Sequence, residues 1–305
     1  MSYELQAARI RIPCSTSNLG SGYDTVGLAL DRYLEVTFEP DDSGGIVLER
    51  EGSLAGEIGP DLVATTFKKQ LARDGIEPGG VLRLTSSIPI ARGLGSSAAA
   101  VLAGFDLARA ACERPRADVD AFEATLAHEG HGDNAAPCLY GGLRAVARTA
   151  DGSVVMQLRL SEAVGFAYAA PAVRLTTEAA RKALPKSVPH RTAAMALGRL
   201  AALIRGLDEG DRELIQVGVS DELHVPHRLP MIPNAASAMS AASDAGAWAV
   251  TISGAGSGLI AMCEPALAAG VAEAMRVVFD AGTGDPECVG FEVRPDYQGL
   301  QRLPL

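Results

Sequence analysis

The sequence predicts a two-lobed α+β protein, with a mixed α/β N-terminal lobe over residues 1–160 and a ferredoxin-like C-terminal lobe over residues 161–305. Three observations predict this fold. The chain has 305 residues, and a single core tends to split beyond about 250–300 residues. In the first half, runs with strand-like alternation are mixed with runs of helical periodicity. The second half follows the order β-α-β-β-α-β, with extra helices inserted, which is the order of a ferredoxin-like domain.

In the N-terminal half, β-branched or alternating runs predict strands at 8–13, 33–38, 81–87, 143–148 and 153–160. Helices are expected at 61–74, from about 95 to 111, and at 117–129. Gly75 is expected to end the first of these helices, and Asp118 to cap the third.

In the C-terminal half, a strand is expected at 164–170, followed by helices through 176–243. Two strands, 248–253 and 258–263, surround a glycine-rich turn, and a helix at 265–281 and a strand at 288–294 complete the lobe. The boundary between the lobes is expected near 155–163.

The composition and the N-terminal residues predict a soluble cytoplasmic protein. The formal charge of −10 argues against a nucleic-acid partner, because phosphate backbones need a basic surface. The N-terminus has no apolar core typical of a signal peptide, and no apolar run reaches the ~18–20 residues of a membrane span. The five cysteines form no CxxC pair, so we expect reduced thiols and no zinc site. They are Cys14, Cys112, Cys138, Cys263 and Cys288.

The segment PIARGLGSSA, residues 89–98, comes immediately before a long Ala-rich stretch. Gly93 and Gly95 would let the backbone approach a ligand closely and adopt positive φ. The start of the following helix leaves N–H groups unpaired and carries partial positive charge, which favours an anion. Ser96 and Ser97 add hydroxyl groups that can bind phosphate oxygens or Mg²⁺. This combination is typical of a triphosphate site.

Other interpretations of this segment remain open from local sequence alone. Residues 93–98 also match the dinucleotide pattern GxGxxG/A, and Glu113 follows at roughly the expected distance. Pro89 and Arg92 argue against that pattern, since a strand should run directly into the first glycine. A Walker A loop is excluded, because no lysine follows the second glycine. A plain helix cap is the simplest alternative.

Three further segments are rich in groups that bind ligands. Residues 13–24 follow the first expected strand and contain Asn18 and Asp24 in a polar turn region. Residues 129–134 gather carboxylates, an imidazole and an amide at a helix end. Residues 253–258, SGAGSG, lie between two strands of the other lobe, where a hairpin would also use glycine.

Taken together, the four segments resemble those of the GHMP kinase superfamily, named for galactokinase, homoserine kinase, mevalonate kinase and phosphomevalonate kinase. The resemblance covers nearly the whole chain, and the three superfamily motifs fall at 13–24, 89–98 and 253–258. Within the superfamily, several phrases are similar to those of homoserine kinases. These phrases are NLGSGYD, EGHGDNAAP, TTEAARKALPKSVPH and DELHVPHRLPMIP.

The resemblance implies that ATP and Mg²⁺ are the cofactors. Ser97 and Glu129 would hold Mg²⁺. The third motif would contribute its glycines, Gly254, Gly256 and Gly258. The nucleotide-binding residues would be Pro89, Ile90, Ala91, Arg92, Gly93, Leu94, Gly95, Ser96, Ser97 and Ala98.

The resemblance also implies that the acceptor is the hydroxyl of L-homoserine. Asn18 and Asp24 would bind the substrate, with Asp24 facing its ammonium group, and Arg181 and Arg228 would bind its carboxylate. The residues implied for catalysis are His131, Asp133 and Asn134. Asn134 stands where related kinases have an aspartate proposed as general base, and an amide cannot take that role.

The chain departs from the family pattern at Ser21, Tyr23, Gly132 and Ser257. Proline is usual at three of these positions and phenylalanine at the position of Tyr23. Alternative functions are a kinase of the same superfamily for another small alcohol or amino alcohol, a nicotinamide oxidoreductase, or a binding or regulatory protein without activity. The expected partner is a small amino acid, with no nucleic acid or membrane, and a homodimer is left open.

Overall fold

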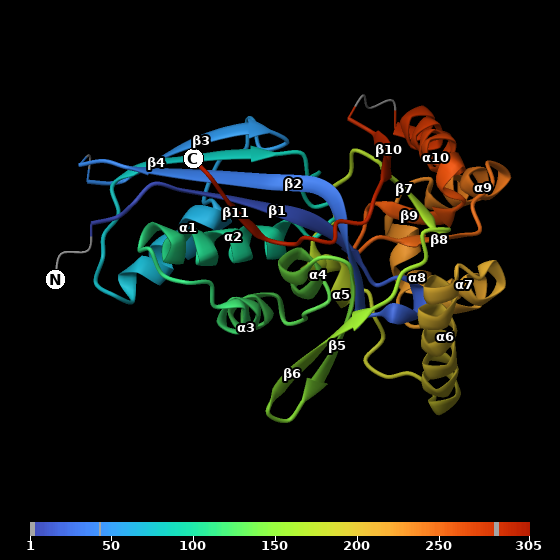
Figure 1. Ribbon diagram of the computed structural model, residues 1–305. Helices are drawn as coiled ribbons and strands as arrows, with labels where there is room; N and C mark the ends of the chain where they lie inside the picture. Colours follow the sequence, from blue (N-terminus) through green and yellow to red (C-terminus); the bar gives the residue numbers. More distant parts are fainter. Residues whose placement is uncertain (1–3, 43, 284–286) are drawn as a thin grey trace.

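The computed structural model in Figure 1 describes residues 4–42, 44–283 and 287–305. The chain forms two β-sheets, each covered by helices. The larger sheet has seven strands in the order β11-β1-β2-β4-β3, with β5 pairing to β2 and β6 to β5. Its strands are β1 (Ala8–Ser17), β2 (Val26–Pro40), β3 (Ile46–Gly52), β4 (Gly80–Ser86), β5 (Leu143–Thr149), β6 (Gly152–Leu158) and β11 (Gln301–Leu303).

Helices pack against the larger sheet and bury its apolar face. The helices of this lobe are α1 (Leu62–Ala72), α2 (Ser96–Ala111), α3 (Asp118–Glu129) and α4 (Ala135–Tyr140). Phe67 of α1 meets Phe38 of β2 with ring centroids 4.8 Å apart, and both side chains are fully buried. The expected face of α2 is buried as well, including Leu102 and Phe105. The expected mixed α/β architecture of this lobe is confirmed.

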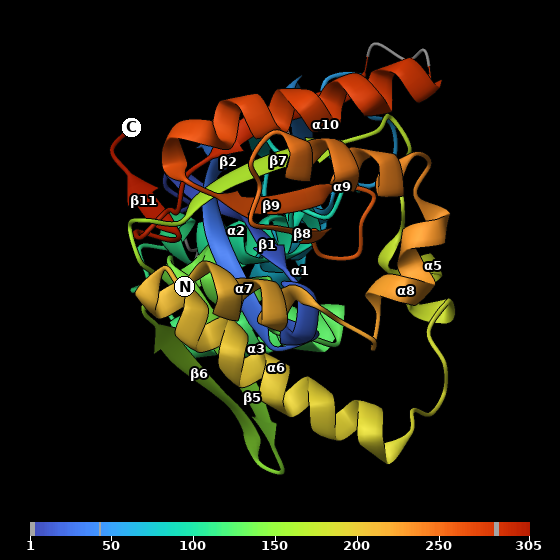
Figure 2. The ribbon, with the colours of Figure 1, turned by 90° about the vertical axis from the view of Figure 1, so that its right-hand side faces the viewer.

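The smaller sheet has four antiparallel strands in the order β10-β7-β9-β8. Its strands are β7 (Gly165–Ala170), β8 (Ala249–Ile252), β9 (Leu259–Cys263) and β10 (Val289–Val293). Both α9 (Ala235–Asp244) and α10 (Ala268–Thr283) pack against it (Figure 2). In chain order this is β-α-β-β-α-β, so the ferredoxin-like prediction is confirmed. The inserted helices are α5 (Thr177–Lys182), α6 (His190–Glu209), α7 (Arg212–Val219) and α8 (Val225–Arg228).

One core cluster spans both lobes, and a second lies within the smaller lobe. The first cluster of buried apolar side chains includes Leu19 and Leu94 as well as Tyr168 and Leu203. After β10 the chain crosses back, and β11 pairs with β1 of the larger sheet (Figure 1). The chain passes from one sheet to the other between Leu158 and Gly165. The division at residue 160 stays a prediction, since the last residues rejoin the first lobe.

Two sequence-based expectations about local structure are wrong, and two strands were missed. Strand β1 continues to Ser17, so the first half of the 13–24 segment is strand, and only its second half is a turn. Asp118 is the first residue of α3 and does not cap it, because Ala117 occupies the cap position. Strands β3 and β11 were not expected, since β3 is a partly exposed edge strand and β11 is only three residues long.

Two observations bear on the wider interpretation of the chain. Within the part of the chain that the structure describes, no helix combines the length and apolarity needed to cross a bilayer. All five cysteines are free thiols, as the sequence predicts.

Candidate active site

The three glycine-containing segments, far apart in sequence, meet in space. The Ser253 hydroxyl donates to the carbonyl of Gly93 (2.6 Å) and lies 2.9 Å from the hydroxyl of Thr16. The backbone N–H of Gly254 donates to the carbonyl of Ser17 (2.9 Å). Hydrogen bonds therefore join β1, the loop before α2 and the turn after β8 into one framework.

The glycines of the loop before α2 are needed for this packing. A Cβ atom at Gly93 would lie 1.9 Å from the carbonyl oxygen of Ser253, and one at Gly95 would lie 2.3 Å from the Ser15 hydroxyl. Both glycines also have positive φ. The positive φ expected at both positions is confirmed, and both glycines line the cavity, so the close approach of a ligand to their backbone stays a prediction.

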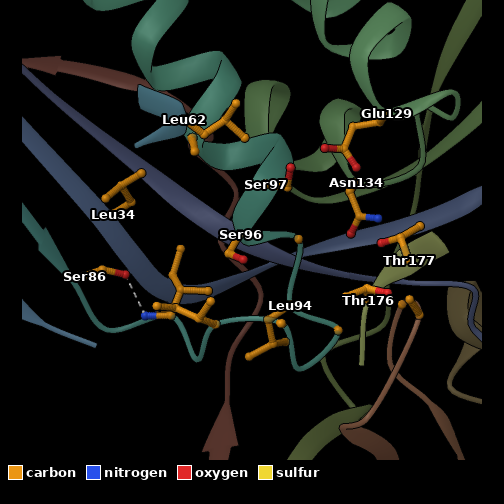
Figure 3. Close-up of a pocket in the computed structure, with 18 of the residues that line it drawn as sticks. Leu34, Leu62, Ser86, Leu94, Ser96, Ser97, Glu129, Asn134, Thr176 and Thr177 are labelled. Carbon is orange, nitrogen blue, oxygen red and sulfur yellow. Dashed lines mark hydrogen bonds between the residues drawn. The ribbon is translucent and has the colours of Figure 1, made fainter. Parts of the chain in front are cut away.

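A cavity of about 390 Å³ lies beside this framework and has two different ends. One end is apolar and comes from β2, β4, α1 and the loops beside them; Figure 3 shows Leu34, Leu62 and Leu94 around it. Ser86 also lines it, but its hydroxyl already accepts a hydrogen bond from the backbone of Ile88 (3.0 Å, Figure 3). The other end is polar. Its lining includes Asn18, Glu129, His131, Asn134, Arg181 and Arg228.

The N-terminus of α2 opens into the cavity between these two ends. Gly95 stands at the cap position in the left-handed conformation and supplies no capping side chain. By contrast, Asp61 and Asp211 cap α1 and α7 with their carboxylates. Since the first-turn N–H groups of a helix have no partners within it, α2 can bind an anion there. Ser96 and Ser97 line the cavity at the same place.

Not every residue expected at the nucleotide faces the cavity. Pro89, Arg92 and Ala98 are not among its lining residues, whereas the other seven residues of 89–98 are. The buried Arg92 guanidinium instead donates to the carbonyl of Glu287 (2.8 Å), and Ala98 is turned into the protein interior. Gly254 and Gly256 also line the cavity, but Gly258 does not. Gly258 faces Tyr168 instead, because a Cβ atom there would lie 2.3 Å from the Tyr168 hydroxyl.

Glu129 is the last residue of α3 and reaches the cavity from the side opposite the glycine loop. Its carboxylate points toward Ser97 in Figure 3. The Glu129 side chain is 11% exposed. Among the described residues, its ion-pair partner is Nε2 of His131, 3.8 Å away, which is beyond hydrogen-bond distance. Glu129 thus keeps oxygen ligands available beside the hydroxyl of Ser97.

His131 and Asp133 form a buried pair next to Glu129. Nδ1 of His131 is hydrogen bonded to the Asp133 carboxylate, and Asp133 is fully buried. Burial lowers the pKa of His131, but the bond to Asp133 outweighs it, so the pKa is raised. Burial alone would raise the pKa of Asp133, but the hydrogen bond and the charge of His131 outweigh burial, so the pKa of Asp133 is lowered. Among the expected catalytic residues, His131 and Asn134 line the cavity and Asp133 does not.

Asn134 is fixed by two serines of β1. Its Oδ1 accepts from the Ser15 hydroxyl and its Nδ2 donates to the Ser17 hydroxyl, both at 2.9 Å. An amide nitrogen carries two hydrogens, so one N–H of Asn134 is left to donate to a ligand. The side chain lines the cavity near Glu129 and Thr177 (Figure 3).

Asn18 and Asp24 are both engaged within the protein. Asn18 donates through Nδ2 to the carbonyl of Gly254 (2.9 Å) and accepts through Oδ1 from the N–H of Asp24 (2.8 Å). Asp24 forms a two-pronged ion pair with Arg181 at 2.8 and 3.1 Å. Burial lowers the pKa of Arg181, but these bonds outweigh it and raise the pKa. Asn18 and Arg181 line the cavity, and Asp24 is next to it through its ion pair with Arg181.

Arg228 differs from the other arginines of the site. Only 1% of its surface is exposed, and it lines the polar end of the cavity. Its guanidinium makes three long contacts, with the carbonyls of Ala180 (3.3 Å) and Gly254 (3.4 Å) and with Nδ1 of His224 (3.5 Å). Over residues 4–42, 44–283 and 287–305, no carboxylate forms an ion pair with it. Burial lowers the pKa of Arg228, as expected for a cation that lacks a counter-ion.

The sequence interpretation missed Thr176 and Thr177, which line the cavity from the second lobe. The hydroxyl of Thr176 caps α5 by accepting from the N–H of Ala179, whereas the Thr177 side chain is directed toward Asn134 (Figure 3). Both threonines lie in the phrase TTEAARKALPKSVPH, whose similarity to homoserine kinases was visible in the sequence. From this phrase, only Arg181 was predicted as a site residue.

One cluster has the composition of a metal site without the availability of one. Potential ligand atoms of Asp24, His131 and Asp133 lie within 4.8 Å of one another. Both oxygens of Asp24 are bound by Arg181, and Asp133 holds His131. Only Nε2 of His131 and Oδ2 of Asp133 remain without a hydrogen-bond partner among the described residues, and two ligand atoms are fewer than a protein metal site uses.

Comparison with known proteins gives consistent matches over the chain. Residues 61–142 match the GHMP kinases N terminal domain, and residues 200–281 match the GHMP kinases C terminal domain. Among curated proteins, the homoserine kinase of Moorella thermoacetica is 36% identical over 272 residues, covering 86% of this chain and 92% of that protein. The homoserine kinase of Microchaete diplosiphon is 33% identical over 279 residues, covering 90% and 91%.

Solved structures show the same relationship. The crystal structure of homoserine kinase from Cytophaga hutchinsonii superposes with a TM-score of 0.85 at 28% identity, covering 97% of both chains. Mevalonate kinase from L. major superposes with a TM-score of 0.72 at 14% identity, covering 96% of this chain and 98% of that chain. The second similarity shows the fold alone.

Proposed function

This chain belongs to the GHMP kinases, together with its homoserine kinase relatives, and on that premise we propose that it transfers the γ-phosphoryl group of ATP to the hydroxyl of L-homoserine. The product is O-phospho-L-homoserine, an intermediate toward threonine. Residues 61–142 and 200–281, which match the two family domains, together make up more than half of the chain.

The observation that carries the choice of acceptor is Arg228. A buried guanidinium is costly unless an anion pairs with it, and this one lines a cavity with no protein carboxylate bound to it. Arg181 lines the same end of the cavity. A planar guanidinium matches a carboxylate group, so a small amino acid fits this end better than a plain alcohol.

The other end of the cavity suits a nucleotide. Its apolar lining can pack against a base, and the uncapped N-terminus of α2 can bind phosphate oxygens through backbone N–H groups. Ser96 and Ser97 add hydroxyl donors to the same place. With the base at the apolar end, the γ-phosphate of ATP would lie toward Glu129 and Asn134, between the two substrates.

The residues at the γ-phosphate position fit Mg²⁺. The cation prefers hard oxygen ligands, and the Glu129 carboxylate and the Ser97 hydroxyl offer them from facing sides of the cavity. Neither oxygen of Glu129 is used by a protein hydrogen bond among the described residues. When bound, Mg²⁺ would neutralise phosphate charge and align the transferring group.

Asn134 would orient the acceptor without acting as a base. Its remaining N–H can donate to the acceptor hydroxyl oxygen, and its place is fixed by Ser15 and Ser17. That oxygen forms a bond to the γ-phosphorus while the bond from phosphorus to ADP breaks, and the hydroxyl proton passes to the transferred phosphoryl group. A loose transition state tolerates this late loss of the proton.

Asp24 and Arg181 would receive the ammonium and carboxylate groups of the amino acid. They form an ion pair with each other at 2.8 Å, and each side chain is about one third exposed. Because an amino acid carries both charges, it can pair with both residues without leaving either one unpaired. This account predicts that acceptors lacking the ammonium or the carboxylate bind poorly.

An assay of ADP release across homoserine, serine, threonine, mevalonate and 3-amino-1-propanol tests the proposal. We expect homoserine to give the highest kcat/KM, by about a hundredfold over 3-amino-1-propanol, which has no carboxylate. Equal use of these two alcohols would contradict the homoserine assignment and favour a GHMP kinase for another small alcohol. A cytoplasmic location and a homodimer stay predictions.

A further inference from the structure

Tyr23 lies behind the acceptor end of the cavity and contacts both arginines that face it. Its hydroxyl accepts a hydrogen bond from Nη1 of Arg181 (3.1 Å). Its ring lies under the guanidinium of Arg228, with 5.2 Å between Cζ and the ring centroid, within the range of a cation–π interaction. Tyr23 itself is not among the residues that line the cavity.

His224 supports the ring of Tyr23 from the other side. The two rings are stacked, with centroids 5.1 Å apart and planes inclined by 27°. Nε2 of His224 is 3.0 Å from the carbonyl of Gly20, and Nδ1 faces Nη1 of Arg228 at 3.5 Å. Burial lowers the pKa of His224, so its neutral form can donate through Nε2 and accept through Nδ1. The histidine thus fixes both Tyr23 and Arg228.

We propose that Tyr23 is a positioning residue that holds Arg181 and Arg228 in the orientation needed to bind an acceptor carboxylate. This inference rests on the proposed function, since it concerns the same site. It gives Tyr23 a role in specificity: the residue would favour acceptors that carry a carboxylate, while acceptors without one would not depend on it.

The arrangement supports this role because Tyr23 contacts both arginines directly. Among the described residues, the polar contacts of Arg228 with two carbonyls and with His224 are long, and the face of the Tyr23 ring covers its guanidinium. Nη1 of Arg181 donates both to the Tyr23 hydroxyl and to the Asp24 carboxylate, and Nη2 donates to Asp24 as well. A phenylalanine at this position would keep the ring and lose the bond to Arg181.

A purely structural role is the alternative. Tyr23 follows the short 3-10 helix Gly20–Gly22, so its stack with His224 also holds this turn in place. Loss of the turn would disturb every acceptor, because Asn18 and Asp24 belong to the same segment. Loss of arginine positioning alone would affect only acceptors with a carboxylate.

The experiment compares Tyr23→Phe and Tyr23→Leu with wild type, using homoserine and 3-amino-1-propanol as acceptors. We expect Tyr23→Phe to raise KM for homoserine about tenfold, the loss of one hydrogen bond to a charged group. Tyr23→Leu should raise it about a further tenfold. The kcat/KM for 3-amino-1-propanol and the KM for ATP should change by less than about twofold.

Tyr33→Phe is the matched control. The Tyr33 hydroxyl donates to Asp296 (3.0 Å), and Arg11 lies over its ring (4.6 Å), but neither Tyr33 nor these partners line the cavity. This variant loses a similar bond to a charged group and should leave the KM for homoserine unchanged.

Each other outcome contradicts a distinct part of the account. An unchanged KM for homoserine in Tyr23→Phe, with wild type preferring homoserine, would overturn the role of Tyr23. An equal loss with both acceptors would also overturn it, because that result indicates a damaged turn. If wild type itself shows no preference for homoserine, the proposed function fails first, and this is seen without any variant.

Discussion

The two ends of the cavity are built in different ways. The nucleotide end uses backbone groups and apolar side chains, most of them from the larger sheet, α1 and the loop before α2. The acceptor end uses charged and amide side chains from both lobes, with Asp24 and Arg181 157 positions apart in the chain. A site of backbone and apolar surface tolerates many substitutions, whereas a site of paired charges depends on each partner. Substitutions should therefore affect the two substrates separately.

The largest effect is expected at Glu129, between the two ends. Glu129→Gln keeps the size of the side chain and removes its charge, so Mg²⁺-ATP turnover should fall on the order of 10²–10³-fold. The measurement is kcat over a series of Mg²⁺ concentrations. Glu123→Gln, an exposed residue of the same helix, is the control. Full turnover by Glu129→Gln at every Mg²⁺ concentration would reject Glu129 as a metal ligand.

Arg228→Leu should separate the two ends of the cavity. We expect KM for homoserine to rise about a hundredfold, or roughly 2–3 kcal/mol, with the KM for ATP near that of wild type. Stability should be little changed, because replacing a buried unpaired cation with an apolar side chain is often neutral.

Arg228→Lys should restore only part of the binding, since a point charge does not reproduce the two-pronged geometry. Arg276→Leu serves as the control, because it removes an arginine of α10 that is distant from Arg228 in the sequence. A matching rise in the KM for ATP in Arg228→Leu would show that the two ends are not separate.

The buried pair of His131 and Asp133 should make stability depend on pH. The raised pKa of His131 means that its contribution is fully present below about pH 6.5 and is lost as pH rises through the raised value. The lowered pKa of Asp133 means that its contribution is present above about pH 3.8 and is lost as pH falls through the lowered value. The pair therefore stabilises most between these limits.

His131→Asn should lower the free energy of unfolding by about 3 kcal/mol at pH 5.5, because it leaves a buried carboxylate without its partner. The difference from wild type should shrink toward pH 9. Urea unfolding at several pH values measures it, with His128→Asn, at an exposed position near the end of α3, as the control. A difference that stays constant with pH would contradict the assigned pKa directions.

The smallest effect is expected at the rim of the nucleotide end. Glu57 and Arg174 form an ion pair there at 2.6 Å that joins a loop of the first lobe to the second, and Arg174 is half exposed. Exposed ion pairs contribute little, so Arg174→Ala should change stability by less than about 1 kcal/mol and leave the KM for ATP nearly unchanged. A KM for ATP raised more than about tenfold would indicate that this pair closes over the nucleotide.

The sequence alone predicted the two lobes, the order of the second lobe and the positions of the three glycine-containing segments. These features depend on periodicity and on local patterns of glycine and polar residues, which short stretches of sequence contain. Strands β3 and β11 were missed because one is an exposed edge strand and the other has only three residues.

The direction of individual side chains could not be predicted in the same way. That Arg92 turns away from the cavity, that Asp24 pairs with Arg181, and that Gly95 makes room for Ser15 all depend on contacts between distant segments. Tyr23 was noted as a departure from the family pattern, but its contacts with two arginines of the other lobe have no local signal.

Identification of the reaction product tests the central claim most directly. The protein would be incubated with ATP, Mg²⁺ and L-homoserine, and the phosphorus-containing products followed by ³¹P nuclear magnetic resonance. The account predicts one new phosphate monoester, with coupling to the adjacent CH₂ protons of homoserine, formed in equal amount with ADP. Release of ADP with inorganic phosphate alone, or no reaction with homoserine while another alcohol is phosphorylated, would contradict it.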